Sequence, residues 1–244
     1  MIHIGLDDTD TADTAGTNQL ARRIADELPR GFRLRVVLRH QLLDDPRVPC
    51  TSQNGSASIG VSSEPQATAG DLLPFLRQHM KAWYVPGSDP GLCVAAGDLP
   101  MEIVEFGRRC QRELVARHDA VALARSHGIT LEDFGGTGDG VIGALAAVGL
   151  LAGGDDGRVV HLPGWAWPDP FSGCHPVEVL LQRGVDEVRD HASGERVTSG
   201  IADIGKHLRP AYRNRRVVLF VQRTGAGPSG TTTRAAAWQA IKLP

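Results

Sequence analysis

The stretch IGLDDTDTADTAGTNQLARRI, residues 4–24, places four aspartates in one short turn between an apolar segment and an amphipathic one. The apolar segment 2–6 has the length of a buried strand, and helical spacing of apolar residues begins at Thr17. A helix that starts just after a strand presents its first amides at the strand's carboxyl end, where open α/β sheets bind ligands. The stretch therefore predicts an α/β or α+β fold with a ligand site at this turn.

The acidic residues of the turn indicate what that ligand is. Three carboxylates within four residues repel one another unless a cation lies between them, and Mg²⁺ is commonly held by one or two carboxylates together with substrate phosphates. Asp7, Asp8 and Asp10 are therefore predicted to hold a metal ion that bridges to a phosphate, whereas Asp13 is expected to face solvent. The alternative is a solvated loop in which one aspartate caps the helix.

Composition sets broad limits. The chain has 244 residues, of which 41% are hydrophobic and 22% charged, and its net charge of −2 provides no global basic field for nucleic acid. The four cysteines are far apart in the sequence, which argues against a zinc site or a disulfide framework. No signal-peptide pattern and no long apolar run is evident, so we expect a cytoplasmic protein that does not associate with membranes.

The order of predicted elements favours a mixed sheet with helices, arranged in two lobes. Alternation predicts a strand over residues 32–40, and apolar runs predict strands at 158–162 and 217–221. Helices are expected at 71–81 and, as one long element, at 102–126. We place the lobe boundary so that residues 1–160 form an ATP- and phosphate-binding portion and residues 161–244 a portion that packs on it.

Three segments together resemble one known family. HIGLDDTDTADTAGTNQLA (residues 3–21), VPCTSQNGSASIGV (48–61) and GGTGDGVIGALAAVGL (135–150) are similar, in this order and with about this spacing, to motifs of the archaeal tRNA-Ile agmatidine synthetase (TiaS) family. The family motifs are an Asp-Asp-Thr-Asp run before a threonine-containing helix start, a Pro-x-x-Thr-x-Gly-Asn-Gly-Ala segment, and a glycine loop. The resemblance covers about residues 1–160.

The resemblance implies a kinase-like domain that uses ATP to phosphorylate the carbonyl oxygen of a tRNA cytidine, which agmatine then displaces. It also implies that a threonine at the helix start, here Thr17, becomes phosphorylated. Asp8 and Thr17 are then the predicted catalytic residues, with ATP and Mg²⁺ as cofactors. The ATP-binding residues implied are Gly16, Thr17, Asn54, Gly55, Gly138, Gly140 and Gly143, and the metal ligands are Asp7, Asp8 and Asp10.

Two departures from the family motifs shape the predicted substrate. The family's basic residues are missing at 51–53, and Asp139 stands where the glycine loop has an arginine. No cysteine-rich zinc ribbon or oligonucleotide-binding barrel is recognisable. The prediction is therefore a Mg-dependent phosphotransferase with a small-molecule acceptor, for which tRNA is an unlikely partner. A non-catalytic nucleotide- or small-ligand-binding protein and a tRNA cytidine-modifying enzyme stay open as alternatives, as does a homo-oligomer.

Other motifs carry weaker expectations. Residues 138–143 fit G-x-G-x-x-G, but they lack the strand and acidic residue of a dinucleotide site, so they are expected to face phosphate or to allow close helix packing. Residues 200–207 have a chance Walker-like spacing, and 225–234 could form an anion loop. An aromatic cluster could stack a ring ligand or close a core; it comprises Trp165, Trp167, Phe171, Cys174 and His175. The simplest reading of the arginines at 33, 35 and 39 is a solvated strand face.

Overall fold

The computed structural model describes residues 1–48, 50, 53–224 and 237–242. Its strands are β1 (Ile2–Asp7), β2 (Phe32–Gln41), β3 (Gly55–Ser63), β4 (Gly91–Ala96), β5 (Thr130–Asp133), β6 (Arg158–His161), β7 (Cys174–Pro176), β8 (Glu187–Asp190), β9 (Ile201–Asp203), β10 (Ala211–Arg213), β11 (Arg216–Arg223) and β12 (Trp238–Ala240). Its helices are α1 (Thr17–Asp26), α2 (Ala69–Trp83), α3 (Met101–Cys110), α4 (Arg117–Ser126), α5 (Gly140–Gly153) and α6 (Val177–Gln182). The predicted strands at 2–6, 32–40, 158–162 and 217–221 are confirmed, as is the helix start at Thr17.

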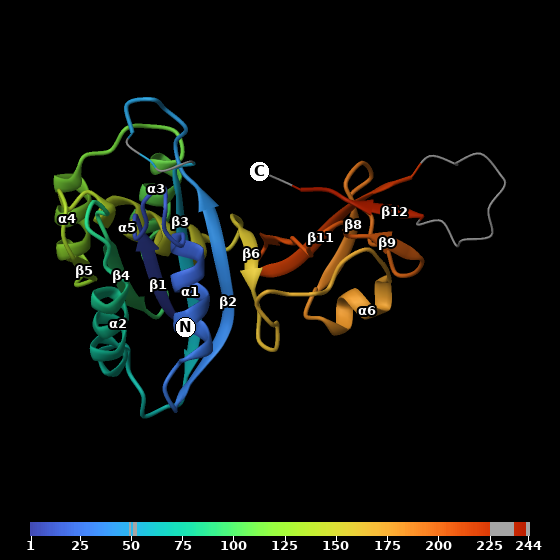
Figure 1. Cartoon of the computed structure of the whole chain (residues 1–244), viewed down its shortest axis with the longest axis horizontal. Helices are drawn as coiled ribbons and strands as arrows, with labels where there is room; N and C mark the ends of the chain where they lie inside the picture. The colour runs from blue at the N-terminus through green and yellow to red at the C-terminus, as the bar shows by residue number, and fades with distance from the viewer. Residues whose placement is uncertain (49, 51–52, 225–236, 243–244) are drawn as a thin grey trace.

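One mixed sheet runs through the described chain, which confirms the predicted fold class. Its order is β5-β4-β1-β3-β2-β6-β10-β11-β12-β9-β7, with β8 paired to β11. The pairs β8–β11 and β9–β12 are parallel, and the other pairs are antiparallel. Figure 1 shows two lobes, with β6 between them. Because β6 pairs with both β2 and β10, the exact domain boundary stays a prediction.

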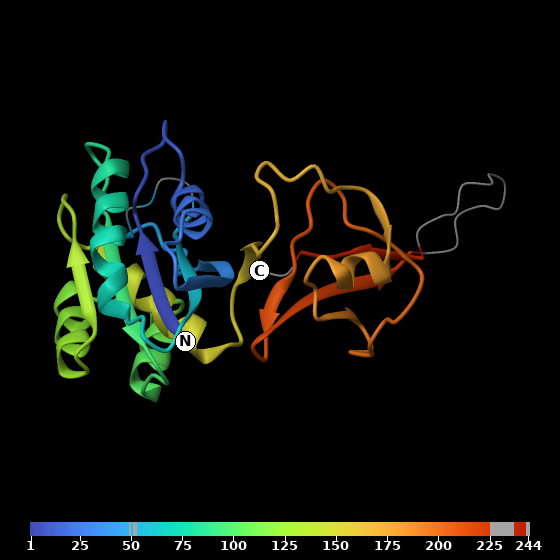
Figure 2. The same cartoon turned by 90° about the horizontal axis from the view of Figure 1, so that it is seen from below.

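Helices cover both faces of the first lobe's sheet (Figure 2). Side chains alternate along β1, so Ile4 and Leu6 enter a core with α1 and α2. The opposite face meets α5, where a Cβ added to Gly5 would lie 1.9 Å from the carbonyl oxygen of Ala144. The acidic turn that the sequence predicts to bind a ligand directly follows β1, the central strand of this lobe. Helices α1 and α2 pack on one face of that strand and α5 on the other.

Glycines let α5 approach its neighbours closely. A Cβ at Gly140 would lie 1.9 Å from the Asp89 carbonyl oxygen, and one at Gly149 would lie 2.1 Å from that of Ile103. Nearly every residue of this helix is buried. The structure therefore shows the close helix packing that was one of the two roles expected for the glycines of residues 138–143.

The prediction of one helix over 102–126 is wrong. The structure has α3 and α4, with a turn after Cys110 in which the Gln111 amide donates to Arg108. A continuous helix over this range would run roughly 37 Å. The break instead allows Ala120 and Ala124 of α4 to enter the same core as Phe106 of α3. The helix expected at 71–81 is confirmed as α2; its start at Ala69 is set by a capping box between Thr68 and Asp71.

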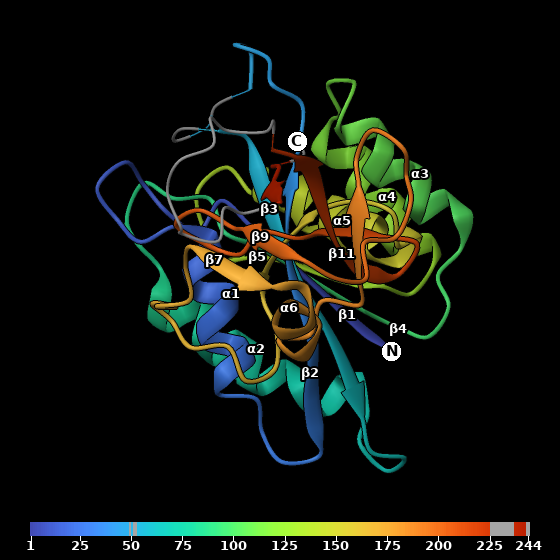
Figure 3. The same ribbon diagram turned by 90° about the vertical axis from the view of Figure 1, so that its right-hand side faces the viewer.

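The second lobe, whose ribbon Figure 3 shows, packs around a core formed by β6, α6 and the strands β8 to β12, which Val36 and Leu38 of β2 and Leu151 of α5 also join. Val188, Leu219 and Val221 of the parallel pair are nearly inaccessible there, and Trp238 of β12 belongs to the same core. Over the ranges that the structure describes, no helix has the length and apolarity needed to cross a membrane.

Burial of His3 predicts acid sensitivity. Its side chain is 3% exposed and its Nδ1 has no partner among the described residues. Burial, the N-terminal charge and Arg215 lower the pKa of His3 from 6.5 to about 4. The unfolded chain therefore takes up this proton at a higher pH than the folded protein, so stability is lost as pH falls from about 6.5 to 4. This loss amounts to about 3 kcal/mol.

Urea unfolding at pH 7 and pH 4 of the wild type and of His3→Gln would measure it. The variant should lose about 3 kcal/mol less than the wild type over this range, because its side chain does not titrate. Equal losses in the two proteins would contradict the assignment to His3.

Candidate functional site

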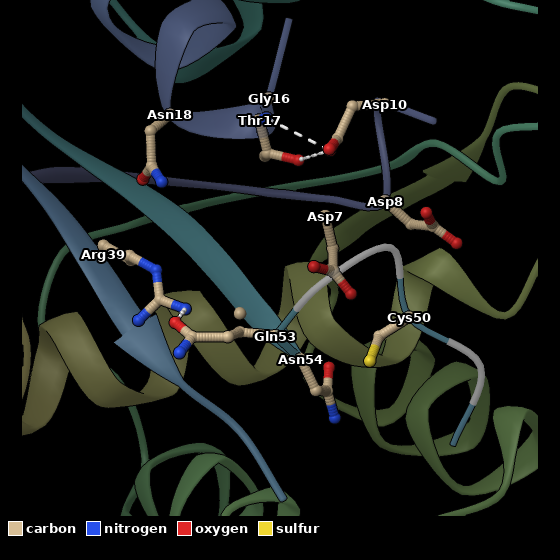
Figure 4. A pocket seen from close by; sticks show the side chains of 11 residues that line it. Asp7, Asp8, Asp10, Gly16, Thr17, Asn18, Arg39, Cys50, Gln53 and Asn54 are labelled. Carbon is tan, nitrogen blue, oxygen red and sulfur yellow. Dashed lines mark hydrogen bonds between the residues drawn. The ribbon is translucent and has the colours of Figure 1, made fainter. Parts of the chain in front are cut away.

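The largest gathering of predicted site residues lies in a cavity at the carboxyl end of β1 (Figure 4). The turn after β1, the start of α1, the end of β2 and the segment before β3 contribute its walls. Its lining residues are Asp7, Asp8, Asp10, Gly16, Thr17, Asn18, Arg39, Cys50, Gln53, Asn54 and Gly55. Seven residues predicted from the sequence are thus brought together, although the two segments that supply them, 7–17 and 54–55, are 37 positions apart.

Asp10 and Thr17 form the best-defined contact in this cavity. The Thr17 hydroxyl donates to Asp10 Oδ1 at 2.9 Å, and the Thr17 amide donates to the same oxygen at 3.2 Å. Gly16 is the N-cap and its position offers no side-chain cap, so Asp10 caps α1 from the turn. Asp10 is thus the aspartate cap that the alternative interpretation of this turn expected, and its carboxylate also accepts a hydrogen bond through the proton of the Thr17 hydroxyl. This carboxylate is placed to accept that proton if the hydroxyl attacks a phosphorus atom.

Asp7 and Asp8 lie in an electrostatically unfavourable position. Burial, followed by repulsion from Asp8, raises the pKa of Asp7 from 3.8 to about 8. Burial and repulsion from Asp89 and Asp10 raise the pKa of Asp8 to about 6. Asp8 also has a φ of +47°, which Asp and Asn tolerate better than most residues. A bound cation would relieve this repulsion.

The three aspartates do not converge on one point. Figure 4 shows the Asp10 carboxylate turned toward Thr17. Across the described ranges, no group of three or more His, Cys, Asp or Glu side chains is arranged to hold a metal ion. The predicted site in which Asp7, Asp8 and Asp10 share one ion is thus not formed by the protein alone. Because Mg²⁺ needs only one or two carboxylates beside phosphates, Asp7 and Asp8 stay predicted ligands.

Arg39 supplies the cation of this cavity, which corrects the interpretation of Arg39 as part of a solvated strand face. Its Nη2 donates to the side-chain oxygens of Gln41 and Gln53, both at 3.1 Å. A Cβ on Gly55 would lie 2.7 Å from this Nη2, so glycine there makes room for the guanidinium. Arg33 and Arg35 are exposed as expected. Arg39 therefore faces the aspartates across the cavity. A phosphate bound between them would have the Arg39 guanidinium on one side and the predicted metal ligands on the other.

The glycine loop before α5 already holds an anion. One carboxylate, that of Asp89, accepts from the amides of Thr137, Gly138 and Asp139 and from the Thr137 hydroxyl. A Cβ at Gly143 would lie 1.9 Å from Asp7 Oδ2. Phosphate binding by Gly138, Gly140 and Gly143 stays a prediction, and for the loop amides it requires Asp89 to move away.

A second cavity adjoins the first and shares Asp7, Asp8 and Asn54 with it. Its further lining is largely apolar and includes Leu42, Leu43, Val48, Leu114, Val115 and Ile142, together with Gly140 and Gly143. The Asn54 side chain, which lines both cavities, donates to the Leu43 carbonyl at 2.9 Å. This hydrogen bond fixes the position of Asn54 between them. A polar compartment beside an apolar one suits a ligand that joins phosphates to a ring.

The remaining motifs lie elsewhere. Lys206 and His207 of the Walker-like segment line a cavity of the second lobe. Residues 225–234, suggested as an anion loop, and residues 51–52 of the second family motif lie outside the described residues. Phe171 and His175 stack on each other at 3.8 Å, while Trp165 packs against the second core.

Sequence reasoning missed Arg39, Asp89 and Asn18 as part of this region. Arg39 follows a register irregularity between Leu34 and Val36, which breaks the alternation on which the solvated-face interpretation depended. Asn18 lines the cavity with a buried Oδ1 that has no partner in the described part of the chain. A helix-start asparagine beside the acidic turn was the available signal for it.

No family model matches the chain. Two curated relatives are both described as tRNA(Ile2) 2-agmatinylcytidine synthetase TiaS. The protein of Pyrococcus horikoshii is 28% identical over 152 residues, which is 61% of this chain and 35% of that protein. The protein of Cenarchaeum symbiosum is 25% identical over 232 residues, which is 81% of this chain and 49% of that protein. This chain therefore spans about a third to a half of the length of these relatives, and the resemblance to TiaS is confirmed.

Solved structures agree in fold. The complex of TiaS with tRNA(Ile2) and ATP matches with a TM-score of 0.54 at 22% identity, over 61% of this chain and 36% of that one. The complex of TiaS with tRNA(Ile2), AMPCPP and agmatine matches with a TM-score of 0.53 at 18% identity, over 87% of this chain and 52% of that one.

These findings correct two predictions. The expectation of a small-molecule acceptor in place of tRNA is wrong, because the relatives are enzymes named for the modification of tRNA. The expectation that tRNA is an unlikely partner is wrong for the same reason. Both rested on a whole-chain net charge and on missing motifs, neither of which describes the local surface. The general expectation of an ATP-using transferase agrees with the relatives.

Proposed function

We propose that this chain binds ATP in the cavity after β1 and uses it to activate a base of tRNA for attachment of an amine. The observation that carries this proposal is that two segments resembling TiaS motifs, 3–21 and 48–61, line one cavity in a chain similar to tRNA(Ile2) 2-agmatinylcytidine synthetases. ATP would place its phosphates between the Asp7–Asp8 pair and Arg39. The ring of the nucleotide or of the target base would occupy the adjoining apolar cavity.

The chemistry needs positioning and charge neutralisation more than covalent participation. A phosphoryl group of ATP passes to the carbonyl oxygen of the base, and the rest of the nucleotide leaves as the P–O bond of ATP breaks. The amine nitrogen then bonds to the ring carbon and releases a proton to solvent, and the oxygen leaves as inorganic phosphate. Arg39 stabilises negative charge that develops on the transferred group. Asp10 accepts the proton of Thr17 when this hydroxyl acts as a phosphate acceptor.

A magnesium ion fits the donor set that Asp7 and Asp8 present, since both are hard oxygen ligands whose repulsion a cation would offset. Bound there, it would neutralise phosphate charge and act as a Lewis acid. A cytoplasmic location, where tRNA and ATP are available, belongs to the same proposal.

Nucleoside analysis tests the proposal. Purified protein is incubated with Mg-ATP, an unmodified tRNA(Ile2) transcript and agmatine, and digested RNA is examined by mass spectrometry. We expect a cytidine whose mass has increased by that of agmatine less one water, because the amine replaces the carbonyl oxygen, and only when ATP is present. ATP binding without any modified nucleoside, with all three components present, would instead favour a nucleotide-binding protein that lacks this activity.

Asp8→Asn is expected to weaken Mg-ATP binding at least tenfold while leaving the fold intact. Asparagine tolerates the positive φ at this position, and removing a charge relieves the repulsion from Asp10 and Asp89. Calorimetric titration gives the affinity and thermal melting the stability, with a melting temperature equal to or above that of the wild type expected. Asp13→Asn, in the exposed part of the same turn, is the matched control. Unchanged affinity in folded Asp8→Asn would refute the metal assignment.

A further inference from the structure

Basic side chains gather at the junction of the two lobes although the whole chain has a net charge of −2. The basic track, as we call it, consists of Arg39, Arg158, Arg209 and Lys242. Arg39 and Arg158 are half-buried and stand directly opposite each other on β2 and β6. Like charges in this arrangement destabilise a sheet. Their presence is therefore more easily explained by an anion that binds between them.

The charges of the track act on one another. Burial, followed by repulsion from Arg39 and Arg209, lowers the pKa of Arg158. Repulsion from Arg158, together with burial, Arg209 and Arg39, lowers the pKa of Lys242. In the described part of the chain no ion pair involves any of these four residues. Asp169, which lines the same groove as Arg158 and Arg209, already binds Arg183 at 2.6 Å. Among the described residues, Arg158, Arg209 and Lys242 thus form no ion pair, and Arg39 faces carboxylates only across the first cavity.

The basic track leads away from the candidate active site. Arg39 lines the cavity that holds Asp7 and Thr17. Arg158 and Arg209 line a groove of the junction, and Arg209 and Lys242 line the next cavity along the second lobe. Cations spaced along a surface in this way match a chain of phosphates better than one isolated phosphate group.

A stacked pair lies in the same groove. The guanidinium carbon of Arg22 is 3.6 Å from the centre of the Trp167 ring, and Arg22 Nε is fixed by the Val160 carbonyl at 3.1 Å. Trp167 is nevertheless 50% exposed, which is unusual for a residue of this size. Arg22 supports the ring from one side, so the exposed remainder is available for stacking on a planar ligand.

We propose that this surface binds a single-stranded segment of RNA, with Trp167 stacked on an unpaired base and the basic track contacting the flanking phosphates. The inference rests on the proposed function and adds the route by which the RNA would leave the active site. Unpaired bases are required because bases inside a helix cannot reach an aromatic platform. Sequence preference is not expected from such contacts.

RNA binding by the full chain tests the inference separately from modification. The probes are an unmodified tRNA(Ile2) transcript and a 12-nucleotide polyuridylate, with affinity measured across a salt series. Arg158→Gln and Arg209→Gln should each weaken binding several-fold and reduce the slope of log K against log salt by about 0.7 per lost phosphate contact. Arg33→Gln, an exposed arginine of the same strand as Arg39, is the control and should leave both quantities unchanged.

Tryptophan substitution tests the stacking. Trp167→Ala should weaken polyuridylate binding about tenfold, whereas Trp167→Phe should retain most of the affinity. Quenching of tryptophan fluorescence by the RNA should be clearly reduced in both variants, a result that a merely structural role of Trp167 would not produce; Trp165 in the same groove accounts for any remainder. Melting curves confirm that the variants are folded.

Three outcomes would overturn the inference. The first is wild-type affinity and salt slope in Arg158→Gln and Arg209→Gln. The second is quenching in Trp167→Phe that is as strong as in the wild type. The third is inorganic polyphosphate that binds as tightly as RNA of equal charge, which would reduce the surface to a general anion site. If the track variants bind RNA normally while the wild type modifies it, only the track fails; if RNA binds as expected but no nucleoside is modified, only the proposed function fails.

Discussion

Asp10→Asn is expected to slow phosphorylation of Thr17 at least about 100-fold, the range in which a positioned general base contributes. In the wild type, the Thr17 hydroxyl donates a hydrogen bond to Asp10 Oδ1 at 2.9 Å. The amide of an asparagine in this place would be a far weaker base than the carboxylate. Incubation with Mg-ATP followed by phosphopeptide mapping measures the rate. Because asparagine is as good a helix cap as aspartate, the start of α1 should persist and the melting temperature should change little.

Two companions sharpen this experiment. Thr17→Ala should remove the modified peptide entirely, and Asp13→Asn should behave as the wild type because Asp13 is exposed. A wild-type protein that leaves Thr17 unmodified in the presence of Mg-ATP and tRNA would show that Thr17 serves only the local structure. Wild-type phosphorylation in Asp10→Asn would exclude Asp10 as the base.

Gly5→Ala is expected to destabilise the first lobe by about 3 kcal/mol or more, at the upper end of the cost of overpacking. Its Cβ would lie 1.9 Å from the Ala144 carbonyl oxygen and 2.9 Å from the Ala144 carbonyl carbon, so backbone must move. No rotamer can relieve such a contact, because both partners are main-chain atoms of the central strand and of α5. Urea unfolding would measure the change.

Gly70→Ala provides the opposite case for comparison. Gly70 is an exposed residue of α2, and its added Cβ would lie 3.5 Å from Thr68 Oγ1, an ordinary contact. Alanine should therefore leave stability unchanged or raise it by up to about 1 kcal/mol through helix propensity. Equal destabilisation by both substitutions would contradict the role assigned to close packing between β1 and α5.

Local patterns in the sequence determined much of the scaffold. The apolar run before Asp7 predicts β1, and the helical spacing after Thr17 predicts α1, since both periodicities depend on neighbouring residues alone. The same locality explains the error at 102–126. Nothing near Cys110 interrupts the helical pattern, and the break follows from packing α3 and α4 into one core.

By itself, the sequence also determined which segments resemble TiaS and that an acidic turn precedes a helix start. Net charge misled the prediction about tRNA, because it averages over a surface on which four cations lie together at the junction of the lobes.

Only the tertiary structure decided what each polar group does. Asp10 faces Thr17, Asp89 occupies the amides of the glycine loop, and Arg39 turns into the cavity. These assignments join residues seven to 50 positions apart, through contacts whose geometry is set by how β1, α5 and β2 pack. Spacing along the chain carries no information about such contacts, because side-chain direction at a turn depends on the elements that close over it.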